Sequence, residues 1–281
     1  MKWICILVFL SMCYAQMDTE IYLFDFENEN GKYKLTNGKN ITQRDGYDNQ
    51  PYFSHDGKYV YYSSIHGEKN SDIYRYSIAD GKTQQITTTP EAEYSPTIID
   101  KHNNFSTVRV EKDDKQRIWK FTHGKPQLIA EHIDQIGYHC WLDSTTIGIF
   151  RIEKTMNLKI ISTNTKQMKH VANNIGRALV LDPRDNKLLY LSKENPKEFV
   201  ICKLSQIDDI AVQPITKTIG QGEDFTCTVK GEIVMADANK VYVYQKGKWN
   251  LIFDGKDKFA GVFNRIALSP DNRKICIVYQ E

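Results

Sequence analysis

Eight residues of this chain could act on a common ligand if the fold brings them to one place. They are Gln50, Tyr94, Tyr138, His139, Arg177, Glu223, Asp224 and Arg265. Arg177 and Arg265 carry planar guanidinium groups, which would hold an anion such as a peptide carboxylate with forked donors. Glu223 and Asp224 could instead supply hard oxygen ligands to a cation such as calcium. The residue types therefore indicate a site for a polar ligand, a peptide carboxylate or a cation.

The histidine of this set could titrate near neutral pH and serve as a general acid or base. His139 is followed by Cys140, but adjacent side chains on a strand point to opposite faces. A Cys–His nucleophile pair is therefore not expected, and a hydrogen-bonded histidine in a channel is favoured. We assign no catalytic residue and no metal ligand.

These residues come together only if the chain repeats. A polar turn follows an apolar run in two clear copies, Ser54-His55-Asp56-Gly57 and Ser269-Pro270-Asp271-Asn272. With the weaker copies, this turn occurs six times at a mean spacing of about 43 residues. An alternating strand, such as DIYRYSI or KVYVY, recurs six times in step with this turn. Four short strands with hairpin-type turns fit one period. The sequence predicts an all-β fold, a six-bladed β-propeller with four antiparallel strands per blade.

The phase of the repeat predicts how the ring closes. The chain begins on two outer strands and ends on two inner ones, so the last blade is built by strands from both termini and residues 16–281 form a single propeller domain. Alignment of the copies places the eight residues where the innermost strands begin, at one mouth of the central channel. The alternative is that they only line a water-filled axis, which is polar in any propeller.

The first copy, NQPYFSHDGKYVYYSS followed by SDIYRYSIADGKTQQIT, resembles the TolB-like propeller repeat, a relative of the WD40-like repeats. Residues 266–278 also match it well, whereas the middle four copies lack its Pro and Gly. The resemblance covers the propeller but leaves no room for the helical N-terminal domain of TolB itself, so it indicates the family and not TolB. It implies an exported bacterial protein with a non-catalytic, protein-binding role.

The N-terminal sequence MKWICILVFLSMCYA predicts a signal peptide over residues 1–15, with Gln16 as the mature N-terminus. Its apolar run is too short for a membrane span. A lipid anchor at Cys13 is disfavoured, because Met12 stands where a lipobox has a small residue. Four cysteines remain after cleavage, each in a strand-like run, and buried thiols are favoured over disulfides.

The composition and the motifs limit the classes of function. The formal net charge of +2 gives no electrostatic case for nucleic acid. The sequence contains no GxSxG, HExxH, Walker or GxGxxG motif. We therefore expect a monomeric protein of the periplasm or the extracellular space that needs no cofactor. We expect it to bind a protein or peptide of the cell envelope through loops at one channel mouth. The alternative is a small hydrolase or lyase that acts on glycan or peptide in that mouth.

Overall fold

The computed structural model describes residues 18–67 and 70–281. The predicted signal peptide, its cleavage point and Cys13 lie outside these residues. The described part of the chain contains 24 strands and no helix, which confirms the all-β prediction. Within it, no helix is long and apolar enough to cross a bilayer.

Four antiparallel sheets each consist of four strands that are consecutive in the chain. The first has β7 (Ala92–Ile98), β8 (Phe105–Val110), β9 (Gln116–Thr122) and β10 (Lys125–Ile129). The second has β11 (Ile136–Trp141), β12 (Thr146–Ile152), β13 (Met156–Ser162) and β14 (Met168–Ala172). The third has β15 (Ile175–Asp182), β16 (Lys187–Ser192), β17 (Val200–Gln206) and β18 (Ala211–Lys217). The fourth has β19 (Phe225–Cys227), β20 (Ile233–Asp237), β21 (Lys240–Gln245) and β22 (Lys248–Asp254).

The remaining eight strands form one sheet with two antiparallel halves. One half has β3 (Tyr47–Phe53), β4 (Tyr59–Ile65), β5 (Ser71–Ser77) and β6 (Thr83–Gln85). The other half has β23 (Val262–Leu268), β24 (Lys274–Gln280), β1 (Thr19–Glu29) and β2 (Lys32–Asn40). A single parallel pair, Thr19 with Tyr47, joins the two halves.

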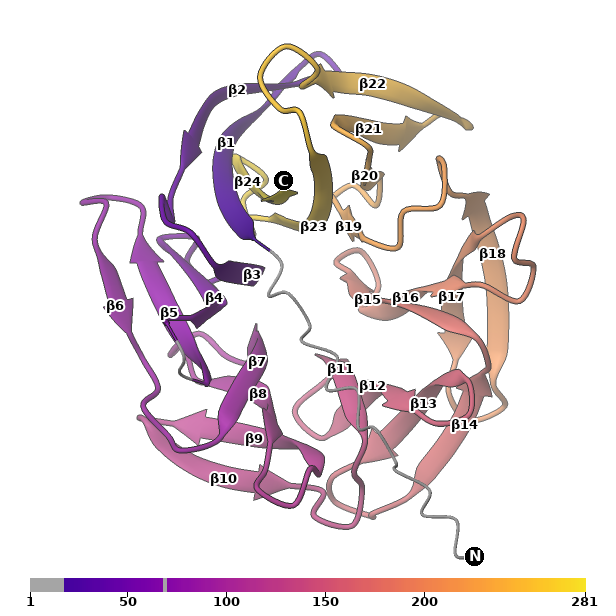
Figure 1. Cartoon of the computed structure of the whole chain (residues 1–281). Helices are drawn as coiled ribbons and strands as arrows, with labels where there is room; N and C mark the ends of the chain where they lie inside the picture. Colours follow the sequence, from indigo (N-terminus) through magenta and orange to yellow (C-terminus); the bar gives the residue numbers. More distant parts are fainter. Residues whose placement is uncertain (1–17, 68–69) are drawn as a thin grey trace, which may run out of the picture.

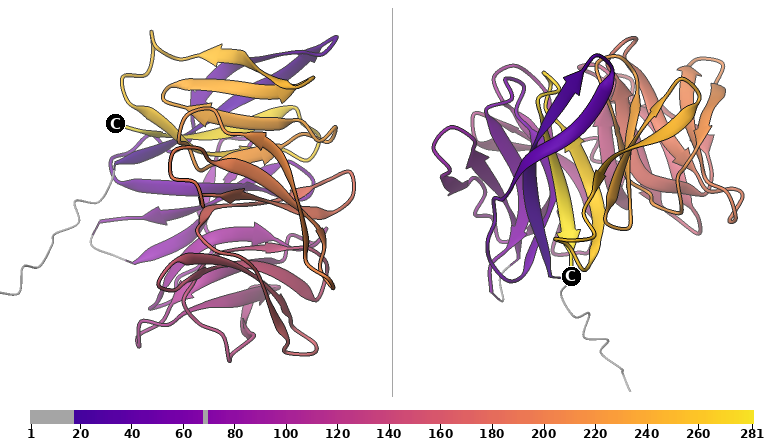
Figure 2. Two further views of the ribbon diagram at one scale, coloured as in Figure 1. Left: turned by 90° about the vertical axis from the view of Figure 1, so that its right-hand side faces the viewer. Right: turned by 90° about the horizontal axis from the view of Figure 1, so that it is seen from above.

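Strands from both ends of the described chain share this sheet, as the phase of the repeat predicts. β1 pairs with β24 along seven residues, from Thr19 opposite Gln280 to Asp25 opposite Lys274. Figure 1 shows the sheets arranged around a common axis, with β3, β7, β11, β15, β19 and β23 nearest to it. The side views in Figure 2 show that the strands run roughly along this axis. Residues distant in the sequence therefore meet where the innermost strands converge.

The hydrophobic core lies between neighbouring sheets, since each sheet buries both faces. Leu189 and Leu191 of β16, for example, pack with Phe225 of β19 and Met235 of β20. The four cysteines of the described chain are free and buried within such clusters, which confirms the expectation of buried thiols. They are Cys140, Cys202, Cys227 and Cys276.

The repeated turn has the same hydrogen bonds in its two clearest copies. Ser54 Oγ donates to Asp56 Oδ1, and Ser269 Oγ donates to Asp271 Oδ1, at 2.7 Å in both turns. Each serine oxygen also accepts a bond from the backbone N–H five residues later, at 2.9 Å in both. The fourth residue of the first turn, Gly57, has a φ of +69°, which glycine adopts without strain. In both copies the aspartate therefore orders the turn.

Candidate functional site

The innermost strands are irregular at the positions that the repeat alignment selects. Five of them slip by a residue or more against the second strand of their sheet, within residues 49–52, 94–97, 136–138, 175–179 and 264–266. Gln50, Arg177 and Arg265 lie inside these segments, and Gln50 has a φ of +58°. A β-bulge re-aims side chains that regular alternation would place elsewhere. The irregularities therefore determine which side chains surround the channel mouth.

Four of the eight predicted residues form one connected cluster. Arg177 Nε donates to both carboxylate oxygens of Asp224, at 3.1 and 2.9 Å, and its Nη2 donates to Oδ2 as well. Arg265 Nη1 lies 3.5 Å from Asp224 Oδ1, and its Nη2 donates to the Tyr138 hydroxyl at 2.6 Å. The Arg265 guanidinium also lies 4.7 Å from the centre of the Tyr138 ring. We call Arg177, Asp224, Arg265 and Tyr138 the ion cluster.

The charges of Asp224 and Arg177 are fixed at neutral pH. Burial alone would raise the pKa of Asp224, but the nearby Arg265 and Arg177 outweigh it and hold that pKa below its ordinary 3.8. Burial would lower the pKa of Arg177, yet Asp224 raises that pKa above its ordinary value. The forked donors of Arg177, which the sequence suggests for a ligand anion, already hold a carboxylate of the chain itself.

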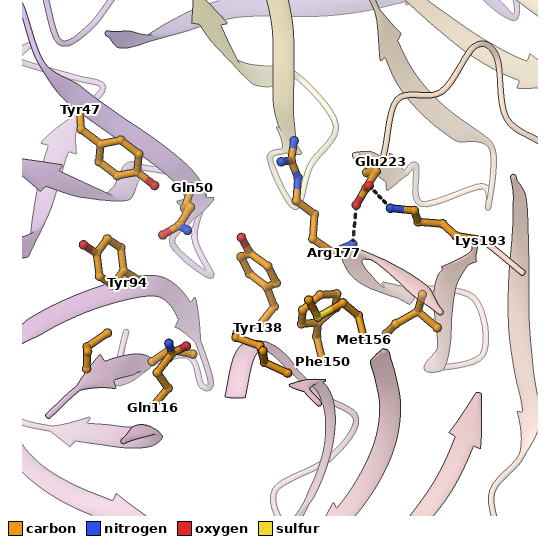
Figure 3. Close-up of a pocket in the computed structure, with 15 residues that line it drawn as sticks. Tyr47, Gln50, Tyr94, Gln116, Tyr138, Phe150, Met156, Arg177, Lys193 and Glu223 are labelled. Carbon is orange, nitrogen blue, oxygen red and sulfur yellow. Dashed lines mark hydrogen bonds and ion pairs between the residues drawn. The ribbon is translucent and has the colours of Figure 1, made fainter. Parts of the chain in front are cut away.

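The other predicted carboxylate has a separate set of contacts. Glu223 Oε1 forms an ion pair with Lys193 Nζ, and its Oε2 accepts a bond from the Arg177 backbone N–H at 3.3 Å (Figure 3). Lys193 follows β16, the second strand of its sheet. Sequence alignment of the innermost strands could not find it. The second strand of each sheet runs antiparallel to the innermost one, so its end lies at the mouth where the innermost strand begins. A search of the residues at that end would have found Lys193.

Tyrosines line the opposite part of the mouth, around a cavity of about 530 Å³. Figure 3 shows Tyr47, Tyr94 and Tyr138 with Gln50 at the same opening. The rings of Tyr47 and Tyr94 meet edge to face, with centroids 6.3 Å apart. Burial raises the pKa of both hydroxyls. Gln50 Oε1 accepts bonds from the Ser95 backbone N–H at 2.7 Å and from a serine hydroxyl. Tyr47 is a member that the alignment missed, because it lies three residues before the selected position.

His139 does not join these residues. Its side chain is buried, and its Nε2 lies 2.6 Å from Ser106 Oγ. It is not among the residues that line the cavity of Figure 3. Burial lowers its pKa from 6.5 to about 3, so the ring is neutral at physiological pH. Cys140 packs into an apolar cluster instead, as the alternation of a strand requires.

The cation hypothesis needs Glu223 and Asp224 as joint ligands. In the structure, Asp224 faces two arginines and Glu223 faces Lys193. Among residues 18–67 and 70–281, no group of three or more His, Cys, Asp or Glu side chains is arranged to hold a metal ion. The geometry therefore offers no assembled carboxylate site in this part of the chain.

Comparison with solved structures defines the class of fold as a β-propeller. A protein of Agrobacterium tumefaciens assigned as TolB superimposes with a TM-score of 0.69 at 16% identity, covering 94% of this chain and 99% of that one. TolB of Acinetobacter baumannii gives 0.61 at 11% identity, covering 94% of this chain and 64% of that one. A chain of the nidogen/laminin complex gives 0.65 at 12% identity, covering 89% and 97%.

A gluconolactonase of Xanthomonas campestris shares the fold as well, with a TM-score of 0.62 at 9% identity over 92% of this chain and 95% of its own. No protein-family model and no curated protein matches the sequence. The chain thus has a TolB-like propeller fold, and at these identities the likeness concerns the fold alone.

Proposed function

We propose that this protein is an exported, monomeric, six-bladed β-propeller that binds a protein or peptide of the cell envelope through one mouth of its channel and catalyses no reaction. The count of six treats the eight-stranded sheet as two blades, because only the pair Thr19–Tyr47 joins its halves. Export rests on the signal-like residues 1–15. Binding to protein rests on the make-up of the mouth.

The observation that carries the proposal is the aromatic and apolar lining of the cavity in Figure 3. Besides its tyrosines, the cavity is lined by Val108, Val110, Ile152 and Met156. Met156 is 39% exposed although it belongs to a strand of the sheet. Tyrosine, methionine and arginine are the residue types enriched where protein interfaces gain most of their energy. A preformed opening of this kind suits side chains of a protein segment.

The charges at the mouth favour binding over the alternative of a hydrolase or lyase. A general acid at neutral pH needs a carboxyl group with a raised pKa. The pKa of Asp224 is lowered, and Glu223 is held by Lys193. Both carboxylates therefore serve better to fix the strands than to transfer a proton.

Site-specific photocrosslinking tests this proposal with a matched pair of positions. Met156 on β13 lines the mouth and is 39% exposed, whereas Met168 on the adjacent outer strand β14 is 42% exposed and does not line it. A benzophenone amino acid replaces either methionine, and the variants are irradiated in the native envelope. We expect one defined adduct from position 156 and none from position 168.

Two results would contradict the proposal. One is the same set of adducts from both positions, which would mean non-selective surface contact. The other is the absence of an adduct from position 156 together with cleavage of a glycan or peptide that is incubated with the purified protein. That second result would favour the enzyme alternative.

A further inference from the structure

A second cavity of about 630 Å³ lies on the propeller axis. It extends from the ion cluster to the turns at the far ends of the innermost strands, and every one of these strands contributes to its wall. This volume is within the range of about 300–1,000 Å³ that is usual for small-molecule sites. The cavity adjoins the mouth described above, and the two share Gln50, Tyr138 and Arg177 in their walls.

The wall of this axial cavity is largely apolar and is carried by rigid strands. Tyr52 lies within β3 and is 40% exposed, although the residues on either side of it are buried. Leu179 and Leu181 on β15 and Ala267 on β23 are also only partly buried, and all of them line the cavity. A ligand that covers exposed apolar side chains on these strands removes them from water, and this lowers the free energy of the complex.

The inner end of the cavity carries an excess of positive charge. Arg177 and Arg265 both line it, and the one carboxylate within ion-pair distance of them, among the described residues, is Asp224. The neighbouring Lys193 and Glu223 offset each other. Two guanidinium groups and one carboxylate leave one net positive charge at this end, whereas Asp100 and Asp143 line the cavity among the turns at its other end. This uneven distribution favours an added anion at the inner end only.

The turns that form the outer rim are tied to one another. The His55 backbone N–H donates to Asn103 Oδ1 of the next sheet at 3.2 Å. The Val229 backbone N–H donates to Asn272 Oδ1 at 2.7 Å in the same way. The opening is therefore preformed, and a ligand does not have to order it.

We propose that the axial cavity is a second binding site, for a small organic acid. Its aromatic or aliphatic body lies against Tyr52 and Leu179, and its anionic group faces Arg265 and Arg177. The site takes its ligand from the end of the channel opposite to the protein-binding mouth. Tyr52, Leu179 and Thr226 line this cavity and not the protein-binding mouth, whereas Met156 lines only the mouth. Ligand binding in the axial cavity and crosslinking at position 156 therefore test the two proposals separately.

Two naphthalene dyes of nearly equal shape test this proposal by fluorescence titration. The dyes are 1-anilinonaphthalene-8-sulfonate, which is an anion, and N-phenyl-1-naphthylamine, which lacks the sulfonate. We expect one saturable site for the sulfonate, at least tenfold tighter than for the neutral dye. Arg265→Gln should weaken the sulfonate about tenfold and leave the neutral dye unchanged, because only the charge interaction is lost.

A second pair of variants keeps the test independent of Arg265. Thr226 lines the cavity on β19, so Thr226→Trp should fill it and abolish binding of both dyes. Val212 is 39% exposed on the outer strand β18, so Val212→Trp adds bulk elsewhere and should change neither dye. Equal affinity for the two dyes would overturn the proposal, and so would sulfonate binding that survives Thr226→Trp.

Discussion

Replacing Asp224 by asparagine tests whether the ion cluster holds the innermost strands together. Asp224 is 8% exposed and contacts both Arg177 and Arg265, which come from different sheets. Asp224→Asn keeps the shape and leaves two guanidinium groups close together without a counter-charge. Loss of one partner of a buried ion pair costs about 3–5 kcal/mol of unfolding free energy. Water reaches the Arg177 side chain, which is 32% exposed, so we expect a loss near the lower end, about 3 kcal/mol.

Urea unfolding at pH 7 measures this loss directly, and thermal unfolding should show a midpoint lower by roughly 6–12 °C. Asp113→Asn is the matched control, because Asp113 pairs with Lys115 at the surface and is 52% exposed. That change should leave the midpoints of urea and thermal unfolding nearly unchanged, because solvent screens an exposed ion pair. An Asp224→Asn protein as stable as the Asp113→Asn control would refute a structural role for the cluster.

The pH dependence provides a second check on Asp224. Its folded-state pKa lies below the ordinary 3.8. The stability that its charge contributes is therefore complete above the unfolded pKa and is lost as the pH falls through the lower, folded value. The difference between wild type and Asp224→Asn should be constant from pH 7 to about pH 5 and shrink in more acidic solution. A difference that already vanishes at pH 5 would contradict the assigned direction.

Three further predictions follow from buried groups and turns. The pKa of His139 falls from 6.5 to about 3 on folding, so the stability that its neutral ring contributes is complete above pH 6.5 and is lost towards pH 3. Between pH 8 and pH 5, wild type should therefore lose about 2 kcal/mol of unfolding free energy relative to His139→Gln. Equal pH profiles of the two proteins in urea unfolding would exclude this. In a chain that begins at Gln16, the four cysteine thiols should react with a thiol reagent only after denaturation, because burial raises the pKa of all four. Fast labelling of the native protein would contradict their burial. Ser54→Ala and Ser269→Ala should each lower the free energy of unfolding by about 1–2 kcal/mol, since both variants lose the same hydrogen bonds of the turn. Thermal or urea unfolding measures this loss, and a large difference between the two variants would disprove the equivalence of the two turns.

The sequence predicts the fold through features that are local to one repeat. Ser54 and Asp56 bond within a single turn, so their type and spacing are enough to identify it. The residue types of β4 predict a strand, and its five central residues are all buried because both faces of the sheet pack against neighbouring sheets. The pairing of β1 with β24 follows from the phase of the repeat, because only that arrangement leaves no open edge.

The sequence predicts the site only as a set of positions. The alignment places Arg177, Asp224 and Arg265 at the same end of the innermost strands, and the ion pairs of Asp224 with both arginines show that the three side chains meet. Which of them bond to each other depends on the bulges of those strands. Those bulges come from the packing of whole sheets, and no residue type in the repeat marks them. His139 has the right position in the alignment, yet its side chain bonds to Ser106 because strand register decides the face it occupies.

The affinity of the crosslinked partner for variants of the mouth tests the central claim most directly. Tyr94 lines the mouth, whereas Tyr244 lies on β21 against Trp249, away from it. Loss of an aromatic residue at the centre of an interface costs about 2 kcal/mol or more, which is about 30-fold in the dissociation constant. We predict that Tyr94→Ala weakens binding of the purified partner about 30-fold and that Tyr244→Ala changes it less than twofold. Unchanged binding to Tyr94→Ala would contradict recognition through this mouth.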